Sequence, residues 1–394
     1  MIEKTVADFF AGIGLVQIGL ERQGWSTVYS LDYSEEKKEM YSAHFGTHHY
    51  RVRNIHEISV DEIPTVLLAH ASFPCTDISV AGSRSGLNGK ESSAFWGFIR
   101  ILDQLNSRRP PLVLIENVEG FLTSQKGKDL EVALEALGNL GYALDMMLIN
   151  ASHFVPQSRT RLFIIGIQNE ESQNIFEQES LLLSSSSEVR SHKMRHFIRS
   201  HANIKWNLRP IPPLPKCNLT ITDIIDATCE WWPRGRSEYL FNQMSNRHKE
   251  KIYEMMANKN WSYGTVFRRM RNVNGLKKSM AELRTDGIAG CLRTPKGGSA
   301  RQIVIRAGQG RFDARLLSAR ECARLMGADE YCLPQDLPLN QALFGFGDAV
   351  CVPAIEWLAQ HVLSPIASEL DVEPKNQYVV PDLILSRQEP VSHF

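Results

Sequence analysis

The sequence of 394 residues predicts an α/β fold, with a parallel sheet domain and a second, smaller domain. Short apolar runs typical of strands alternate with amphipathic segments typical of helices, which is the pattern of a parallel sheet. The chain is longer than most single domains, so two domains are expected. Hydrophobic residues make up 43% of the chain and charged residues 22%, which is ordinary for a globular protein with a sizeable core.

The N-terminal segment has the order strand, glycine turn, helix, strand and acid: residues 5–10, Gly12 and Gly14, residues 16–25, residues 27–31, and Asp32. The glycines let the backbone approach a ligand closely, and an acid about 20 residues later can accept hydrogen bonds from ribose hydroxyls. Because position 17 is Gln, the full G-x-G-x-x-G pattern is missing. A nucleoside ligand without a pyrophosphate, such as S-adenosylmethionine, is therefore favoured over NAD.

Cys75 follows the end of a second predicted strand. Residues 65–73 (TVLLAHASF) form an apolar run that should stop at Pro74, because proline has no N–H to donate. Cys75 would then lie just beyond the carboxyl end of a strand, where ligands bind in open α/β sheets. A buried structural thiol is the alternative for such a cysteine.

Further strands are predicted at 111–115, 142–149 and 162–167, with helices at 94–105 and 130–140. Glu116 and Asn117 follow the first of these strands. Because the carboxyl ends of parallel strands lie along one edge, we expect Asp8, Asp32, Cys75 and Glu116 to converge there.

Gln157, Arg159 and Arg161 alternate just before the last of these strands. With a period of two they should share one face, where a pair of guanidinium groups suits phosphate or carbonyl oxygens. The alternative is a solvated strand edge.

A net charge of zero hides an uneven distribution of charge. Between Arg190 and Arg311 there are 24 Lys and Arg against 8 Asp and Glu, and the rest of the chain holds 20 against 36. Such a basic block indicates a region that binds a polyanion, although it could also be a solvated basic surface. The block contains tryptophans and an arginine cluster that suit nucleic-acid contact: Trp206, Trp231, Trp232, Trp261, Arg268, Arg269 and Arg271.

The remaining segments are connectors and C-terminal helices. Residues 169–190 are polar and predict a hinge or loop, and residues 209–215 (RPIPPLP) predict an extended connector. Residues 318–326 predict a helix that begins with a capping box of Ser318 and Glu321. Another amphipathic helix is predicted at 355–363, and no motif is legible after Ser364.

Seven cysteines without a C-x-x-C pair suggest neither a zinc site nor a disulfide framework. The N-terminus has no long apolar segment, and no run approaches the length of a membrane span. We therefore expect a reducing, cytoplasmic compartment and no membrane partner.

Six motifs occur in order over residues 8–352: FFAGIGL, FPCTDIS, IENVEGF, QSRTR, SARECARLMG and GDAV. Together they resemble the motif series of DNA (cytosine-5)-methyltransferases of bacterial or phage type. The resemblance implies an α/β fold: a Rossmann-like S-adenosylmethionine-dependent methyltransferase sheet domain with a smaller inserted target-recognition domain. The sheet domain would comprise residues 1–180 and 338–394. The target-recognition domain and its hinge would comprise residues 181–337, which contain the basic block.

The resemblance also implies roles for single residues. Cys75 would be the nucleophile, Glu116 the acid at the cytosine ring nitrogen, and Asn117 a neighbour at the same catalytic edge. Arg161 and Arg159 would hold the base carbonyl and a nearby phosphate, and Ser79 would lie on the loop that closes over the flipped nucleotide. The positions that match cofactor contacts are Phe10, Gly12, Ile13, Gly14, Asp32, Tyr33, Asn54, Ile55, Pro74, Asp348 and Val350.

The sequence departs from the family pattern at several positions. Leu15 replaces a third loop glycine, and residues 76–78 (TDI) replace Gln-x-aromatic. Asp348 stands where asparagine is usual, and Asn54 where aspartate is frequent. A compensating exchange between the last two is one explanation.

The implied activity is methyl transfer from S-adenosyl-L-methionine to C5 of a flipped-out cytosine in a specific sequence of double-stranded DNA, through a covalent Cys75–C6 intermediate. A tRNA cytosine-5 methyltransferase is one alternative, and the large basic block argues against it. A catalytically silent DNA-binding homologue is another, and the intact set of Cys75, Glu116 and Arg161 argues against that. We expect a monomer in the cytoplasm, nucleoid-associated when bound to DNA. A cognate restriction endonuclease that acts separately is compatible with this activity.

Overall fold

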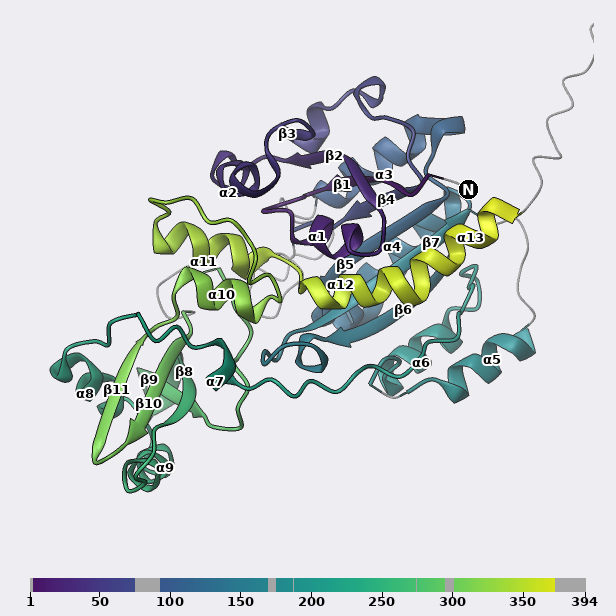
Figure 1. Cartoon of the computed structure of the whole chain (residues 1–394). Helices are drawn as coiled ribbons and strands as arrows, with labels where there is room; N and C mark the ends of the chain where they lie inside the picture. Colours follow the sequence, from purple (N-terminus) through teal and green to yellow (C-terminus); the bar gives the residue numbers. More distant parts are fainter. Residues whose placement is uncertain are drawn as a thin grey trace, which may run out of the picture.

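A large mixed sheet forms the centre of the molecule (Figure 1). The computed structural model describes residues 3–74, 93–168, 175–186, 188–273, 275–294 and 301–372. Within these residues the large sheet has seven strands in the spatial order β3-β2-β1-β4-β5-β7-β6. The strands are β1 (Thr5–Phe9), β2 (Ser26–Asp32), β3 (Tyr50–Val52), β4 (Leu68–Ala71), β5 (Leu112–Val118), β6 (Tyr142–Asn150) and β7 (Thr160–Gln168).

The direction of β7 corrects the expectation of a wholly parallel sheet. Pairing is parallel from β3 to β5, whereas β7 runs antiparallel to both β5 and β6. A buried strand is equally apolar in either direction, so the sequence pattern does not report its orientation. As a result, the start of β7 lies at the same edge as the carboxyl end of β5.

Helices cover both faces of the large sheet. Those in the described N-terminal half are α1 (Leu15–Glu21), α2 (Glu35–Phe45), α3 (Ser93–Leu105), α4 (Lys128–Asn139), α5 (Ile175–Ser184) and α6 (His192–Ser200), with short 3-10 turns η1 (Ile55–Glu57), η2 (Val60–Glu62), η4 (Asn106–Arg108), η5 (Glu119–Gly127) and η6 (Ala151–His153). Successive strand residues belong to different apolar clusters. Phe9 and Ile115 pack in the cluster that contains α3 and α4, whereas Val6 and Leu114 pack in the one that contains α1. This alternation is that of a strand buried on both faces.

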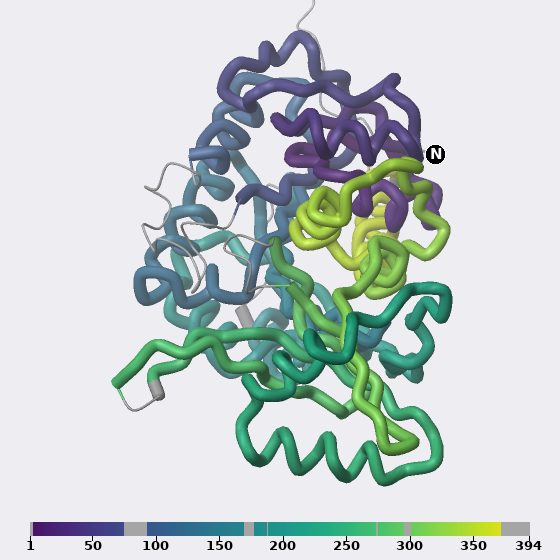
Figure 2. Tube along the Cα trace, turned by 90° about the vertical axis from the view of Figure 1, so that its left-hand side faces the viewer, coloured from purple at the N-terminus to yellow at the C-terminus, as the bar shows by residue number. Residues whose placement is uncertain are grey.

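A smaller antiparallel sheet follows, in the order β11-β10-β8-β9. Its elements are α7 (Ile221–Ile224), α8 (Arg234–Asn242), α9 (Asn246–Met256), β8 (Ser262–Val273), β9 (Leu276–Arg284), β10 (Ile303–Gly308) and β11 (Arg311–Leu316). Figure 2 shows the β8–β9 hairpin projecting sideways from this part of the chain. The predicted arrangement of a large sheet domain with a smaller insert is therefore confirmed, while the strands of the insert were not predicted.

The chain returns to the large sheet through α10 (Ala319–Leu325) and α11 (Leu339–Asp348). The predicted capping box is present: the N–H of Glu321 donates to Ser318 Oγ at 3.1 Å, and the N–H of Ser318 donates to Glu321 Oε2 at 2.8 Å. The Glu321 carboxylate also receives a buried ion pair from Arg315 at 2.6 Å. The cap thereby joins the last strand of the insert to the returning helix.

The segment before the insert packs differently from expectation. Residues 169–190 were predicted to be a hinge or loop, yet α5 lies within them, and Leu182 is buried in the same cluster as α3 and α4. Trp206 also belongs to this cluster, and its indole Nε1 donates to His201 O at 3.0 Å. A domain boundary at residue 181 and a nucleic-acid contact for Trp206 are therefore wrong, because this segment covers the large sheet.

The C-terminal helices are more apolar than expected from the sequence. They continue from α11 into α12 (Val352–Leu358), the π-helical turn η7 (Ala359–Leu363) and α13 (Ser364–Val372). Residues 339–371 are long and apolar enough to cross a membrane, contrary to the expectation from the sequence, but 72% of the most apolar window is buried inside the protein. Figure 1 shows α12 and α13, in yellow, lying across the large sheet. Their apolar character therefore has a structural explanation as one wall of the core.

Candidate active site

The turn between β1 and α1 has a tightly determined backbone. Phe10 has φ of 63°, and Gly12 and Gly14 have φ of 60° and 82°. A phenylalanine in the left-handed region is uncommon, and such strain persists mainly at functional sites. A Cβ atom on Gly14 would come within 2.5 Å of the Phe45 ring, so only glycine fits there, whereas one on Gly12 would meet open space beyond 3.9 Å.

Asp32 is fixed at the carboxyl end of β2 by this turn. Its Oδ2 accepts from the N–H of Gly12 at 2.9 Å, and its Oδ1 accepts from the N–H of Ser34 at 3.0 Å. The next residue, Tyr33, is 63% exposed, which is unusual for a large aromatic ring. A buried carboxylate beside an exposed ring fits an adenosine group, because the acid can accept from ribose hydroxyls and the ring can stack on the base.

Other positions assigned to the cofactor serve the surroundings of this turn. Ile13 is buried in a cluster with α10 and α11, and its carbonyl accepts from the Tyr331 hydroxyl at 2.8 Å. Ile55 and Val350 are likewise buried. The Asn54 Oδ1 atom accepts from the N–H of His56 at 3.0 Å and caps η1.

Asp348 ends α11 and is partly exposed. It forms an ion pair with Lys37, with Nζ and Oδ2 3.1 Å apart. The suggested exchange between Asn54 and Asp348 therefore has a different explanation, since each side chain has its own partner.

Glu116 lies at the end of β5, only 5% exposed, with both carboxylate oxygens engaged. Arg161 Nε contacts Oε1 at 2.9 Å, and the Ser72 hydroxyl donates to Oε2. The antiparallel register places Arg161 opposite Val118, which explains how the start of β7 reaches this carboxylate. Ser72 was not identified from the sequence, because its position between a strand and Pro74 carries no chemical signal.

Asn117 connects this carboxylate to the segment that contains Cys75. Its Nδ2 donates to Phe73 O at 3.3 Å, and its Oδ1 accepts from the N–H of Val118 at 2.9 Å. Cys75 and Ser79 lie outside the described residues, and Pro74 is the last described residue before them. The chain therefore enters the cysteine segment beside Glu116.

Asp8, which was expected at this edge, is instead buried and pairs with His70, with Oδ1 and Nδ1 2.6 Å apart. Both side chains are almost completely enclosed by the protein. They belong to the interior below the edge, so the predicted convergence of four groups is wrong for Asp8.

Arg159 differs from the expectation that it faces a phosphate. Its Nη1 donates to Leu292 O at 2.9 Å, and its Nη2 donates to Gly347 O at 3.1 Å and Ala349 O at 2.6 Å. Burial and the nearby charge of Arg161 lower the pKa of Arg159. Its hydrogen bonds thus tie the insert and the end of α11 to the large sheet, so that the two alternating arginines have different roles.

Gln157 continues this link between distant segments. Its Nε2 donates to Leu325 O at 2.7 Å, and its Oε1 accepts from the N–H of Leu292 at 3.0 Å. The neighbouring backbone forms a parallel bridge between Gln157 and Ala289.

Cys291 is a second thiol close to these arginines, and it was not identified from the sequence. Its Sγ lies 3.2 Å from Arg159 Nη1 and 4.0 Å from Arg161 Nη2. Burial raises the pKa of the Cys291 thiol, but Arg159, Arg161 and Arg293 outweigh it and lower the pKa overall. Among the described residues, no group of three or more His, Cys, Asp or Glu could hold a metal ion.

Comparison with solved structures agrees with this fold. A methyltransferase of Entamoeba histolytica, EhMeth, superimposes with a TM-score of 0.61 at 15% identity, covering 93% of this chain and 99% of that one. The Dnmt2 methyltransferase of S. pombe gives a TM-score of 0.56 at 17% identity, covering 92% and 99%. At these identities the likeness concerns the fold.

Curated relatives match along the sequence. The Type II methyltransferase M.DsaV of Dactylococcopsis salina is 27% identical over 91% of this chain and 86% of that protein. M.HpaII of Haemophilus parainfluenzae is 25% identical over 93% and 91%. M.Bsp6I of a Bacillus species is 31% identical, but over 42% of this chain and 53% of that protein.

The model of one protein family, described as C-5 cytosine-specific DNA methylase, matches residues 4–364. This range includes the β1–α1 turn, the Glu116–Arg161 pair, the small sheet and the returning helices. The chain therefore belongs to the C-5 cytosine-specific DNA methylases and is a DNA cytosine-5 methyltransferase.

Proposed function

We propose that the protein methylates C5 of a cytosine flipped out of a specific double-stranded DNA sequence, through a covalent bond between Cys75 and C6. The observation that supports this most is the arrangement at the end of β5. Arg161 and Ser72 hold the Glu116 carboxylate, and Asn117 holds the strand that leads into Cys75. A nucleophile and an acid for opposite sides of one bond system would then lie together.

The chemistry requires these residue types because cytosine C5 alone is a weak nucleophile. Addition of the Cys75 thiolate to C6 forms an S–C6 bond and moves an electron pair through the ring towards N3. Glu116, carrying a proton, donates it to N3, while Arg161 is positioned to hold the base carbonyl. When bound, S-adenosylmethionine supplies an electrophilic methyl group to C5. Loss of the C5 proton and breakage of the S–C6 bond then release Cys75.

Two parts of the chain would bring the reactants to this edge. The β1–α1 turn, Asp32 and Tyr33 would hold the adenosine part of S-adenosylmethionine, as their donor set and exposed ring suit it. The small sheet would act as the target-recognition domain, with its boundary after the segment 181–208. Taking the cytosine out of the helix costs roughly a few kcal/mol, which contacts to the flipped base and the DNA backbone would offset.

The cellular setting is part of the same proposal. The relatives named above carry the designation Type II methyltransferase, which supports a role in restriction-modification beside a restriction endonuclease that acts separately. We propose that the protein acts as a monomer in the cytoplasm, associated with the nucleoid when bound to DNA.

The nucleophile is tested with duplex DNA that carries 5-fluorocytosine at the target. Fluorine does not leave as a proton does, so elimination stalls and the protein remains attached to DNA through Cys75. Mass spectrometry should find the adduct on Cys75, and Cys75→Ser should abolish both the adduct and methyl transfer. An adduct on Cys291, the second thiol near the Glu116–Arg161 pair, would overturn the assignment.

The substrate is tested by comparing duplex DNA with tRNA under identical conditions. Methyl incorporation into cytosines of one DNA sequence is expected. Methylation of tRNA together with inert duplex DNA would contradict the proposal.

A further inference from the structure

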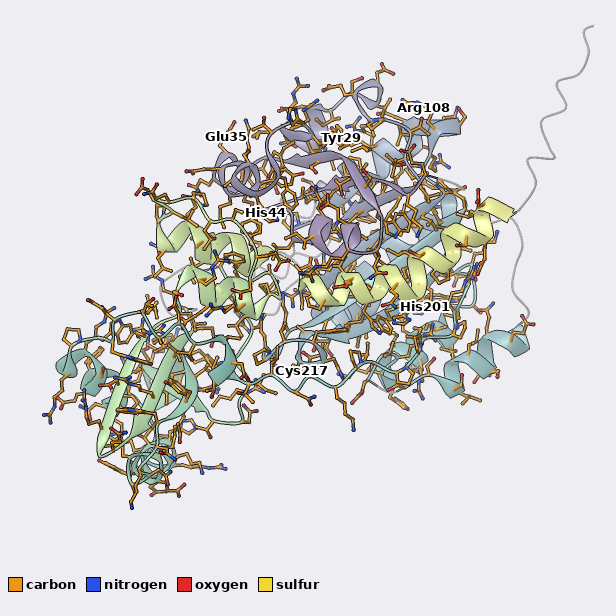
Figure 3. The ribbon with its side chains drawn as sticks, in the orientation of Figure 1. Tyr29, Glu35, His44, Arg108, His201 and Cys217 are labelled. Carbon is orange, nitrogen blue, oxygen red and sulfur yellow. The ribbon has the colours of Figure 1, made fainter. Side chains whose placement is uncertain are left out.

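Lys37 links two ends of the chain at the proposed cofactor site. It lies in the first turn of α2, where its N–H donates to Ser34 Oγ at 3.2 Å. Its ammonium nitrogen is 3.1 Å from Asp348 Oδ2 and 4.0 Å from Asp32 Oδ2. Figure 3 marks α2 by Glu35 in its first turn and His44 in its last, with α11 beside it.

Both members of the Lys37–Asp348 pair oppose the dipoles of their own helices. A lysine in the first turn of α2 faces the positive end of that helix, and an aspartate at the last position of α11 faces a negative end. Each charge is locally unfavourable, so helix stability does not explain why they are there. A ligand with complementary charges does.

The pair is enclosed enough to be charged and open enough to bind. Lys37 is 20% exposed and Asp348 46% exposed. Burial lowers the pKa of Lys37, but Asp32 and Asp348 outweigh this and raise it, so the ammonium form is retained. A side chain with a second carboxylate at 4.0 Å can exchange partners without leaving its place.

We infer that Lys37 and Asp348 form a subsite for the amino-acid end of S-adenosylmethionine, in which Lys37 binds the α-carboxylate and Asp348 the α-ammonium group. This inference rests on the proposed function, because Asp32 must hold the ribose. The amino-acid chain leaves the ribose at its 5′ carbon, so its charged end lies within a few ångströms of the ribose-binding carboxylate. An ammonium beside a carboxylate is the mirror of a zwitterion.

A purely structural role for Lys37 has a competitor already in place. Gln341 of α11 donates from Nε2 to Glu39 Oε2 at 2.8 Å and to Glu36 O at 3.0 Å. These bonds join α2 to α11 without any contribution from Lys37. Gln341 therefore offers a control for the contact between the helices.

The test is calorimetry with two ligands that share the adenosine part. S-Adenosylhomocysteine carries the amino-acid end, and 5′-methylthioadenosine lacks it. Lys37→Ala should weaken binding of S-adenosylhomocysteine about tenfold or more and leave 5′-methylthioadenosine within about twofold. Lys37→Arg should restore most of the lost affinity, and Asp348→Ala should repeat the selective loss.

Matched variants separate this subsite from general effects. Lys38→Ala removes the neighbouring lysine, whose Nζ pairs with Glu35 at 3.5 Å, and should change neither affinity. Gln341→Ala should also leave the ratio of the two affinities unchanged. Thermal unfolding checks that each variant is folded, and Lys37→Gln provides a neutral side chain of similar length should Lys37→Ala unfold.

The outcomes are distinct. An equal loss for both ligands in Lys37→Ala would show that Lys37 acts through Asp32, and unchanged binding of S-adenosylhomocysteine would show that it has no part in the subsite. Either result overturns the inference. Failure of the unaltered protein to bind both ligands would instead overturn the proposed cofactor site itself.

Discussion

The catalytic edge of the large sheet and the β8–β9 hairpin both present arginines, but they hold them in opposite ways. At the edge, Arg159 and Arg161 are largely buried and bonded to backbone carbonyls or to Glu116. On the hairpin, Arg269 and Arg271 are about half exposed, and both reach the single carboxylate of Glu282. At the edge each arginine is assigned to one partner, whereas on the hairpin the arginines share one and keep charge available to solvent.

The same difference explains what a count of charges can teach. Several arginines of the basic block pair with acids outside it, namely Arg190 with Asp145, Arg199 with Glu179 and Arg209 with Glu369. These pairs bind the block to the large sheet and use up part of its excess charge. The positive surface available for DNA is therefore concentrated on the hairpin rather than spread over the block.

The largest effect is expected from Glu116→Gln. The amide cannot donate a proton to N3 as an acid does, so kcat should fall by roughly 10²–10⁴, the usual contribution of general acid catalysis. Single-turnover methylation of duplex DNA measures it. Glu119→Gln, an exposed change in η5, is the matched control, and an equal loss in both would mean that the defect is not specific to this carboxylate.

Arg159→Met tests the buried half of the comparison. The methionine leaves three backbone carbonyls without their donor, at about 1–3 kcal/mol for each buried acceptor. We expect the free energy of unfolding to fall by about 3 kcal/mol or more, measured by urea denaturation. A loss below about 1 kcal/mol would show that water replaces the guanidinium at this junction.

Asp32→Ala addresses the cofactor side of the sheet edge. Loss of a charge-assisted hydrogen bond to ribose should weaken S-adenosylmethionine binding by about 1.5–3 kcal/mol. Calorimetry gives the affinity, and DNA binding in the absence of cofactor serves as the control. Unchanged affinity would mean that another acid holds the ribose.

The smallest effect is expected on the exposed hairpin. Arg269 and Arg271 share a face, so replacing both with Gln should lower the slope of log K against log salt by about 0.9 for each DNA phosphate that is no longer neutralised. Arg268→Gln, on the other face of β8, is the control. Fluorescence anisotropy at several salt concentrations with cognate and non-cognate duplexes distinguishes phosphate binding from base readout. A slope that does not change in the double variant would place this face away from DNA.

Parts of the structure that depend on local burial could be predicted from the sequence. The strand expected at 27–31 is β2 (Ser26–Asp32), and the helix expected at 94–105 is α3 (Ser93–Leu105), because both carry continuous apolar faces. The direction of β7 and the strands of the insert could not, since an apolar run has no direction and exposed arginine-rich strands lack a clear period. Lys37 and Cys291 were missed for another reason: their neighbours come from distant parts of the chain.

The clasp formed by Gln157 and Arg159 has a consequence for the exchange of DNA specificity between relatives. Ala289 and Leu292 belong by sequence to the insert, yet the backbone at 156–158 exchanges hydrogen bonds with Ala289, and both clasp side chains bind Leu292. The recognition module is thus shorter than the inserted sequence, since its closing segment is part of the catalytic scaffold. A graft that brings in a foreign recognition sequence has to keep residues 289–292 from the host, because the clasp is shaped to this backbone and not to the DNA.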